Sequence, residues 1–258
     1  MIDLKKAKLV FNEYVNIYDQ NDDKVILKIS HTYRVMGRCQ EIAASLNLDD
    51  ENIQLAGLIV LLHDIGRFEQ LKRYQSFIDS QTIDHANLGV TILFDDNLIE
   101  KFEIDKKYYP IIKTAIYNHN KYEIETGLES KTDLHCRIIR DGDKIDIFKT
   151  GLLETFEAFL GTSQFKLEHD VVTVKVFRTF MSCKTVLSTD RKTDLDRWVS
   201  FLALVFGLEF EYSLEYVNSH RYIIRLMDRL DIKDADTRLQ MQQMKNCCID
   251  FLFRNTND

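Results

Sequence analysis

Turn-forming residues are scarce in this sequence, which has one proline and nine glycines among 258 residues. Antiparallel sheets need many turn residues, and parallel α/β folds need glycines where strands lead into helices. The scarcity of both disfavours a sheet-rich fold. Apolar residues instead recur at steps of three and four along nearly the whole chain, as at Leu4, Ala7, Phe11 and Tyr14. This is the period of an amphipathic helix, so the sequence predicts an all-α protein.

Regularly spaced cysteines and long apolar runs are also missing. The five cysteines form no CxxC pair and show no spacing typical of a disulfide framework, so we expect reduced thiols, as in the cytoplasm. The longest apolar runs, such as 58–62 and 201–208, are too short to cross a bilayer. The amphipathic N-terminus lacks the apolar core of a signal peptide. We therefore expect a cytoplasmic protein without a membrane anchor.

Positive charge is in deficit, with a net charge of -7. A general nucleic-acid binder needs a basic face to displace counterions, so we do not expect this function. Small anionic substrates remain compatible with the sequence, because a bound divalent metal would dominate the charge around it.

The apolar period predicts helices at about 3–18, 23–46, 51–63, 83–95, 108–119 and 132–149, then at about 170–183, 192–206, 212–230 and 234–253. The β-branched stretch 171–177 would also suit a strand, but no partner strand with turn signals lies nearby. Gly66 is expected to end the third helix in a left-handed cap. Glycines and polar residues at 151–163 indicate connecting segments between helices. We expect a first domain at 1–150 and an accessory helical region at 151–258 packed on it.

Several polar residues interrupt otherwise apolar helix faces and should point inward: His31, His63, His85, His119 and Asp143. Burying such groups without partners costs several kcal/mol for each group, and a shared metal ion offsets that cost. Nitrogen and carboxylate ligands together suit Mn²⁺, Fe²⁺ or Zn²⁺. Each residue alone is more simply explained as a hydrogen-bonded core histidine or a solvated charge. The prediction of a metal site therefore depends on the whole set.

The order of these residues resembles that of a known family. His31 stands in Ser-His-Thr-Tyr-Arg-Val, and His63 and Asp64 stand in Leu-Leu-His-Asp-Ile-Gly-Arg-Phe. Asp-His85-Ala-Asn-Leu-Gly, Asn-His119-Asn and Arg-Asp-Gly-Asp143-Lys-Ile-Asp follow. With this order, H…HD…H…H…D, residues 24–150 resemble the HD-domain superfamily of metal-dependent phosphohydrolases. The resemblance implies an HD-domain helical bundle with additional C-terminal helices.

The resemblance also implies two divalent ions, each Mn, Fe, Zn or Mg. The first ion would be bound by His31, His63, Asp64 and Asp143. Asp64 would bridge to the second ion, which His85 and His119 would hold. Asp141 competes with Asp143 for the last position. We prefer Asp143, because the family's aspartate is followed by a basic residue and by a further aspartate three residues later, here Lys144 and Asp146.

Such a centre would hydrolyse a phosphate ester, in a nucleotide or another small phosphorylated metabolite, with water that the metal activates. Asp64 would also orient that water. Arg67 and Lys144 flank two of the ligands and are the cations that we expect at the substrate phosphate. The chain contains no Gly-x-Ser-x-Gly and no P-loop, so neither of these other mechanisms is indicated.

Two other functions stay open on the sequence alone. A di-iron oxygenase of the same fold has nearly the same ligands, and ligand identity does not separate hydrolysis from oxygen chemistry. A non-catalytic, metal-stabilised helical module is the other alternative, although it has no need of six ligands. A cyclic-di-GMP phosphodiesterase of the HD-GYP type is disfavoured, because no Gly-Tyr-Pro follows His119. The expected partner is a small phosphorylated substrate. No heptad pattern requires a homo-oligomer, and that question stays open.

Overall fold

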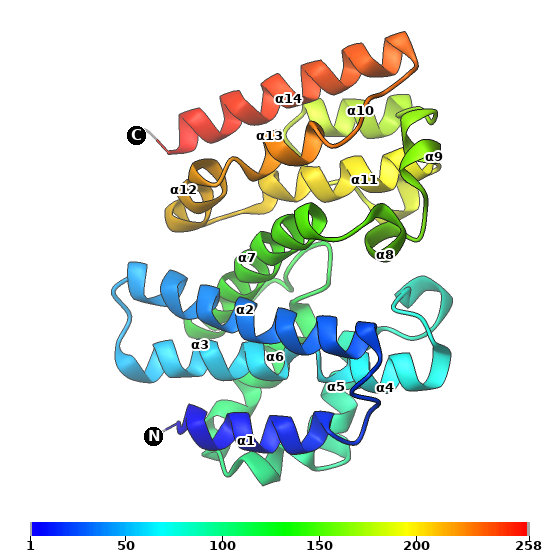
Figure 1. The fold of residues 1–258 in the computed structure, drawn as a ribbon. Helices are drawn as coiled ribbons and strands as arrows, with labels where there is room; N and C mark the ends of the chain where they lie inside the picture. The colour runs from blue at the N-terminus through cyan, green and yellow to red at the C-terminus, as the bar shows by residue number, and fades with distance from the viewer. Residues whose placement is uncertain (1, 257–258) are drawn as a thin grey trace. The chain divides into compact units, whose positions relative to one another are not determined.

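The computed structural model describes residues 2–256, and every regular element among them is a helix (Figure 1). The predicted all-α fold is confirmed. No helix in this range combines the length and apolar character that a bilayer span requires. The chain divides into two compact units, Met1–Gly142 and Asp143–Asp258. The division lies inside helix α7 (Ser130–Leu153), so this helix contributes residues to both units. The domain limits of 1–150 and 151–258 remain a prediction.

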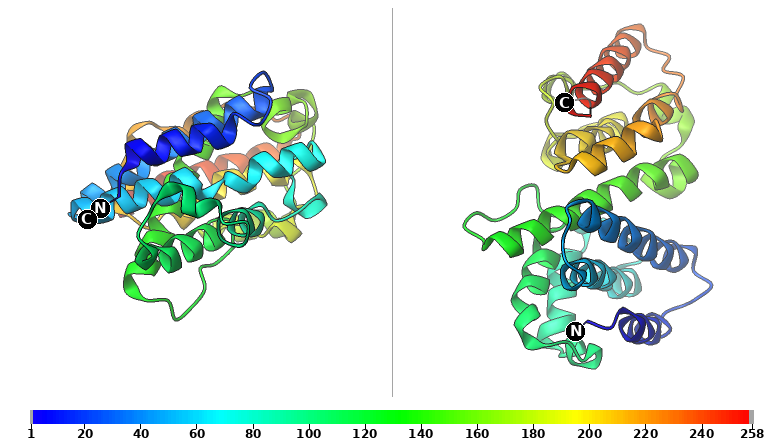
Figure 2. Two further views of the ribbon diagram at one scale, coloured as in Figure 1. Left: turned by 90° about the horizontal axis from the view of Figure 1, so that it is seen from below. Right: turned by 90° about the vertical axis from the view of Figure 1, so that its left-hand side faces the viewer.

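The first unit is built around helix α3. Its other helices surround it: α1 (Leu4–Val15), α2 (Asp23–Ser45), α4 (Ile65–Tyr74), α5 (His85–Val90), α6 (Tyr109–Asn118) and the start of α7. Helix α3 (Asp50–His63) lies between α1 and α2 and also packs on α6 (Figure 1, Figure 2). Every residue from Leu55 to His63 is buried. This stretch is apolar on all sides, so it is the central helix and not an amphipathic one with a single buried stripe.

Short turns complete the first unit and connect its helices. They are the 3₁₀ turns Asp79–Gln81, Leu98–Phe102 and Lys106–Tyr108 and the π-helical turn Thr91–Asp95, which continues α5. Asp22 precedes α2 and its side chain accepts a hydrogen bond from the Lys24 amide at 2.8 Å, as expected for an N-cap.

Gly66 has a role that differs from the predicted one. Asp64 alone separates α3 from α4, which begins at Ile65, and Gly66 lies in the first turn of α4. A methyl group on Gly66 would lie 2.2 Å from the carbonyl oxygen of His85 and 2.6 Å from the amide nitrogen of Gly89. The left-handed cap was therefore a wrong prediction. Glycine is needed at this position because the backbones of α4 and α5 meet there.

The second unit contains the rest of α7 and seven further helices: α8 (Phe156–Leu160), α9 (Gln164–Glu168), α10 (Val174–Met181), α11 (Asp194–Leu202), α12 (Glu211–Ser219), α13 (Tyr222–Met227) and α14 (Ala235–Asn255). Two 3₁₀ turns, Ser188–Asp190 and Ala203–Gly207, join them. The stretch 171–177 enters helix α10 at Val174 and forms no strand. The single helix predicted over 212–230 is two helices, because Arg221 adopts a left-handed conformation with φ of 52°.

Candidate metal centre

The four predicted histidines and Asp64 meet in the interior of the first unit. His31 comes from the middle of α2, His63 ends α3, His85 begins α5 and His119 directly follows α6. All five side chains are buried. They form two groups that could each hold a cation, one made of His31, His63 and Asp64, the other of Asp64, His85 and His119.

Asp64 stands at the centre of this cluster, and its two carboxylate oxygens face different histidines. Oδ2 lies 3.5 Å from Nε2 of His31 and 3.5 Å from Nε2 of His63. Oδ1 lies 3.4 Å from Nε2 of His85 and 3.8 Å from Nε2 of His119. Each oxygen thus faces one of the two groups that could hold a cation.

The position of Asp64 in the chain explains why both oxygens are available. It is the N-cap residue of α4, where an aspartate usually accepts hydrogen bonds from the first free amides of a helix. Here the side chain makes no capping hydrogen bond. Its carboxylate is directed to the histidines and to Lys28, whose Nζ lies 2.7 Å from Oδ2.

The electrostatic surroundings keep Asp64 ionised. Burial raises the pKa of its carboxyl group, but Lys28, then His63 and His85, and then Arg67 lower it by more. The pKa of Asp64 therefore lies well below its ordinary value. The centre holds an anionic ligand at neutral pH, as a divalent ion requires.

Hydrogen bonds from the Nδ1 atoms orient three of the histidine rings. Nδ1 of His63 donates to the carbonyl of Val60 at 2.6 Å, and Nδ1 of His119 donates to the carbonyl of Ile116 at 2.6 Å. Nδ1 of His85 donates to a carboxylate oxygen of Asp79, also at 2.6 Å. These oxygens only accept, so in a neutral ring the proton stays on Nδ1 and Nε2 carries the lone pair.

The Nε2 atoms of His85 and His119 consequently face each other as acceptors, 2.9 Å apart. Burial first, and Arg67 second, lower the pKa of His85, which favours its neutral form. Two lone-pair nitrogens and a carboxylate oxygen directed at one point are the donor set of a metal site. The residues present therefore fit a divalent ion.

The remaining predicted residues have different surroundings. Asp143 lies on α7 and is partly exposed, whereas Asp141 two residues earlier is fully buried. Which of the two completes the first ion's ligands stays a prediction. Lys144 is buried and donates a hydrogen bond to the carbonyl of Gly207 in the second unit.

Arg67 lies beside the cluster and its guanidinium group is held firmly. Nη1 donates to the Gln70 side chain at 2.8 Å, to the carbonyl of Phe77 at 2.7 Å and to Asp79 at 2.8 Å. Its Nε is 3.7 Å from Oδ1 of Asp64. The roles of Arg67 and Lys144 at a substrate phosphate remain predictions.

The sequence did not indicate Lys28 or Asp79. Lys28 lies three residues before His31 on α2, and this spacing places both on one helix face. That spacing is a signal that could have identified Lys28. Asp79 lies in the irregular segment between α4 and α5, where no periodicity indicates the direction of a side chain.

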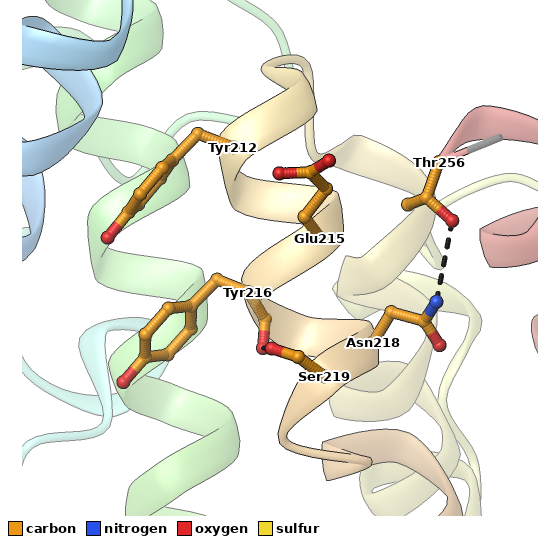
Figure 3. Close-up of a pocket in the computed structure, with 6 residues that line it drawn as sticks. All are labelled: Tyr212, Glu215, Tyr216, Asn218, Ser219 and Thr256. Atoms are coloured by element: carbon orange, nitrogen blue, oxygen red, sulfur yellow. Dashed lines mark hydrogen bonds between the residues drawn. The ribbon is translucent and has the colours of Figure 1, made fainter. Parts of the chain in front are cut away.

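A separate open pocket lies beside α12 in the second unit. Its lining is Tyr212, Glu215, Tyr216, Asn218, Ser219 and Thr256 (Figure 3). The rings of Tyr212 and Tyr216 stack one helical turn apart, and the Asn218 amide donates to the hydroxyl of Thr256 at 3.4 Å. None of the predicted ligands lines this pocket.

Comparison with known proteins identifies one family. No curated protein and no solved structure matches the chain. Residues 29–147 match the family model of the HD domain, and this range includes every predicted ligand from His31 to Asp143. Its helical character and its cluster of histidines around Asp64 agree with that match. Residues 29–147 of this chain therefore form an HD domain.

Proposed function

We propose that the protein hydrolyses a phosphate ester of a nucleotide or another small phosphorylated metabolite at a centre of two divalent ions. The observation that carries this proposal is the position of Asp64. One of its oxygens faces His31 and His63, and the other faces His85 and His119. Paired metal sites joined by a bridging carboxylate are suited to phosphoryl chemistry, in which charge develops on both the attacking and the leaving oxygen.

The residues of the chain would divide the work at this centre. Bound divalent ions supply Lewis-acid activation of water and neutralise charge on the phosphoryl group. Asp64 stays ionised and would orient the attacking water. Arg67 presents a fixed positive charge 3.7 Å from Asp64, where a substrate phosphate would approach. Burial of the whole cluster keeps the local dielectric constant low, which strengthens each of these interactions.

The first experiment measures metal content and phosphate release. The chain is purified, treated with a chelator and reconstituted with Mn²⁺, Fe²⁺, Zn²⁺ or Mg²⁺, and each form is assayed on nucleotides, sugar phosphates and cyclic dinucleotides. We expect up to two ions per chain and phosphate release from at least one substrate class. The His63→Ala and Asp64→Ala variants should lose more than ~100-fold in rate, because even an outer partner of a metal ligand is worth ~10–100-fold.

A matched control separates this effect from a general effect of histidine loss. His220 is exposed and lies outside the first unit, so His220→Ala should retain the full rate. Absence of metal from the Mn²⁺-reconstituted protein, or wild-type rates in both site variants, would refute the proposal. Consumption of oxygen by the Fe²⁺ form without phosphate release would assign the centre to oxygenase chemistry instead.

A further inference from the structure

Asp79 joins two groups that the centre needs. It begins the 3₁₀ turn Asp79–Gln81 between α4 and α5. Its Oδ2 accepts a hydrogen bond from Nδ1 of His85 at 2.6 Å. Its Oδ1 accepts from Nη1 of Arg67 at 2.8 Å and from the side chain of Gln70 at 2.9 Å. One carboxylate therefore contacts both a ligand of the second ion and the cation beside Asp64.

The histidines of the cluster are not supported in the same way. His63 and His119 donate from Nδ1 to backbone carbonyls three residues earlier. His85 instead donates to an anion, and a carboxylate partner makes an imidazole a more basic metal ligand than a neutral carbonyl does. This additional support acts on the group made of Asp64, His85 and His119. In the group made of His31, His63 and Asp64, Nδ1 of His63 donates to the neutral carbonyl of Val60 instead.

We propose that Asp79 is a positioning residue, which orients His85 toward the second ion and fixes Arg67 beside the site where the substrate phosphate binds. This inference rests on the two-ion centre of the proposed function. It adds Asp79, which is not among the predicted ligands, and gives it the role of orienting His85 and Arg67. Asp79 binds no ion in this scheme. Its removal should weaken one ion site selectively and leave the other intact.

The turn that carries Asp79 has an anchor that does not depend on its carboxylate. Gln70 is fully buried, and its amide donates to the hydroxyl of Thr82 at 2.8 Å and to the carbonyl of Ile83 at 2.9 Å. These two bonds should hold the segment between α4 and α5 in place when the Asp79 carboxylate is neutralised. A change in metal binding in such a variant would then report on the support of His85 and not on loss of the fold.

The test is a calorimetric titration of the metal-free protein with Mn²⁺. For Asp79→Asn we expect two ions still to bind, with the Kd of one site raised ~10–100-fold and that of the other changed by less than about threefold. Asp79→Glu restores the charge with a longer side chain and should recover part of the affinity. Circular dichroism and a urea unfolding curve establish that each variant is folded before it is titrated.

Glu69→Gln is the matched control, because it removes one negative charge from α4 at a residue whose partners are Tyr18 and Arg73. It should leave both Kd values unchanged. Equal weakening of both sites in Asp79→Asn, no weakening, or an effect equal to that of Glu69→Gln would overturn the inference, as would binding of a single ion by the wild type. A wild type that binds two ions but releases no phosphate would refute the proposed hydrolysis and leave the role of Asp79 standing.

Discussion

Replacing Lys28 with methionine should destabilise the metal-free protein and increase its affinity for a metal ion. The ammonium group of Lys28 lies 2.7 Å from Oδ2 of Asp64, and its side chain is only 18% exposed. In the metal-free protein, Lys28 is the closest cationic partner of this buried carboxylate. When a divalent ion is bound at the same oxygen, the ammonium group opposes the ion instead. Methionine has a similar length but no charge, so the substitution separates these two effects.

The magnitude follows from the distance and the burial. Two unit charges 2.7 Å apart attract by about 6 kcal/mol at an effective dielectric constant of ~20, before the cost of removing them from water. Loss of one partner from a buried ion pair usually costs ~3–5 kcal/mol. Asp64 retains Arg67 at 3.7 Å, so we expect the lower end, about 3 kcal/mol. If the loss is confined to the metal-free form, metal binding becomes tighter by the same amount, or ~100-fold in Kd.

Urea unfolding followed by circular dichroism measures stability with a chelator and with Mn²⁺, and calorimetry measures Kd. Lys24→Met is the control, because Lys24 lies one turn earlier on α2 and donates at the surface to the carbonyl of Gln75. It should change neither quantity. A loss of less than ~1 kcal/mol in the metal-free Lys28→Met protein, or weaker metal binding by this variant, would refute the reasoning.

Three further predictions concern other residues. Gly66→Ala should destabilise the protein by about 2 kcal/mol or more, because the new methyl group meets the backbone of α5, whereas Gly37→Ala faces open space on α2 and should stabilise it by ~0.5–1 kcal/mol. Burial, and then Lys131, lowers the pKa of His135 to about 4 from an ordinary 6.5. The unfolded chain thus takes up this proton first, so stability should fall by about 3 kcal/mol as the pH drops from 6.5 toward 4. The sulfur atoms of Cys183 and Cys247 lie 3.6 Å apart, so oxidised glutathione should join them in a disulfide with loss of two hydrogens, measured by intact mass.

Equal stability of the two glycine variants in urea would contradict the close contact between α4 and α5. His135→Asn should remove this part of the loss of stability at acid pH, whereas His220→Asn should retain it. If the free energy of unfolding of His135→Asn still fell with pH as steeply as in the wild type, another residue would cause the effect. Cys183→Ser should prevent the internal disulfide. A mass increase of one glutathione in the wild type, without the cross-link, would show that the two thiols cannot meet.

The helices and the candidate ligands could be predicted because both follow from local spacing. The position of His31, four residues from apolar neighbours on either side, is a property of the sequence alone. The junction of α3 and α4 could not be predicted in the same way. A glycine after an apolar helix usually ends it, and only the approach of α5 explains why a glycine stands here in the first turn of another helix. Helices α8 and α9 have five residues each, which is too short for a period to be recognised.

The hydrogen bonds that orient the candidate ligands could not be predicted either, because their effect depends on which residues the tertiary fold brings together. Asp79 contacts His85 only through the path of the turn between α4 and α5. The carbonyl of Val60 orients the His63 ring from within the same helix. The sequence does not show, however, that the other ring nitrogen, Nε2, then faces Oδ2 of Asp64. The residue types at the centre were therefore predictable, and the hydrogen bonds that orient them were not.

The hydrogen bonds from the Nδ1 atoms of His63, His85 and His119 affect which metal ion a purified batch of the protein contains. Folding alone sets these three rings in the tautomer that binds a cation. The side chains are therefore ordered before an ion binds. The ion that occupies a site formed in this way depends on supply, because metal availability, together with geometry and ligand type, decides selectivity in the cell more than raw affinity does. The metal content of a purified batch should therefore record the growth medium, and two batches of one sequence should differ in specific activity until both are stripped and reloaded alike.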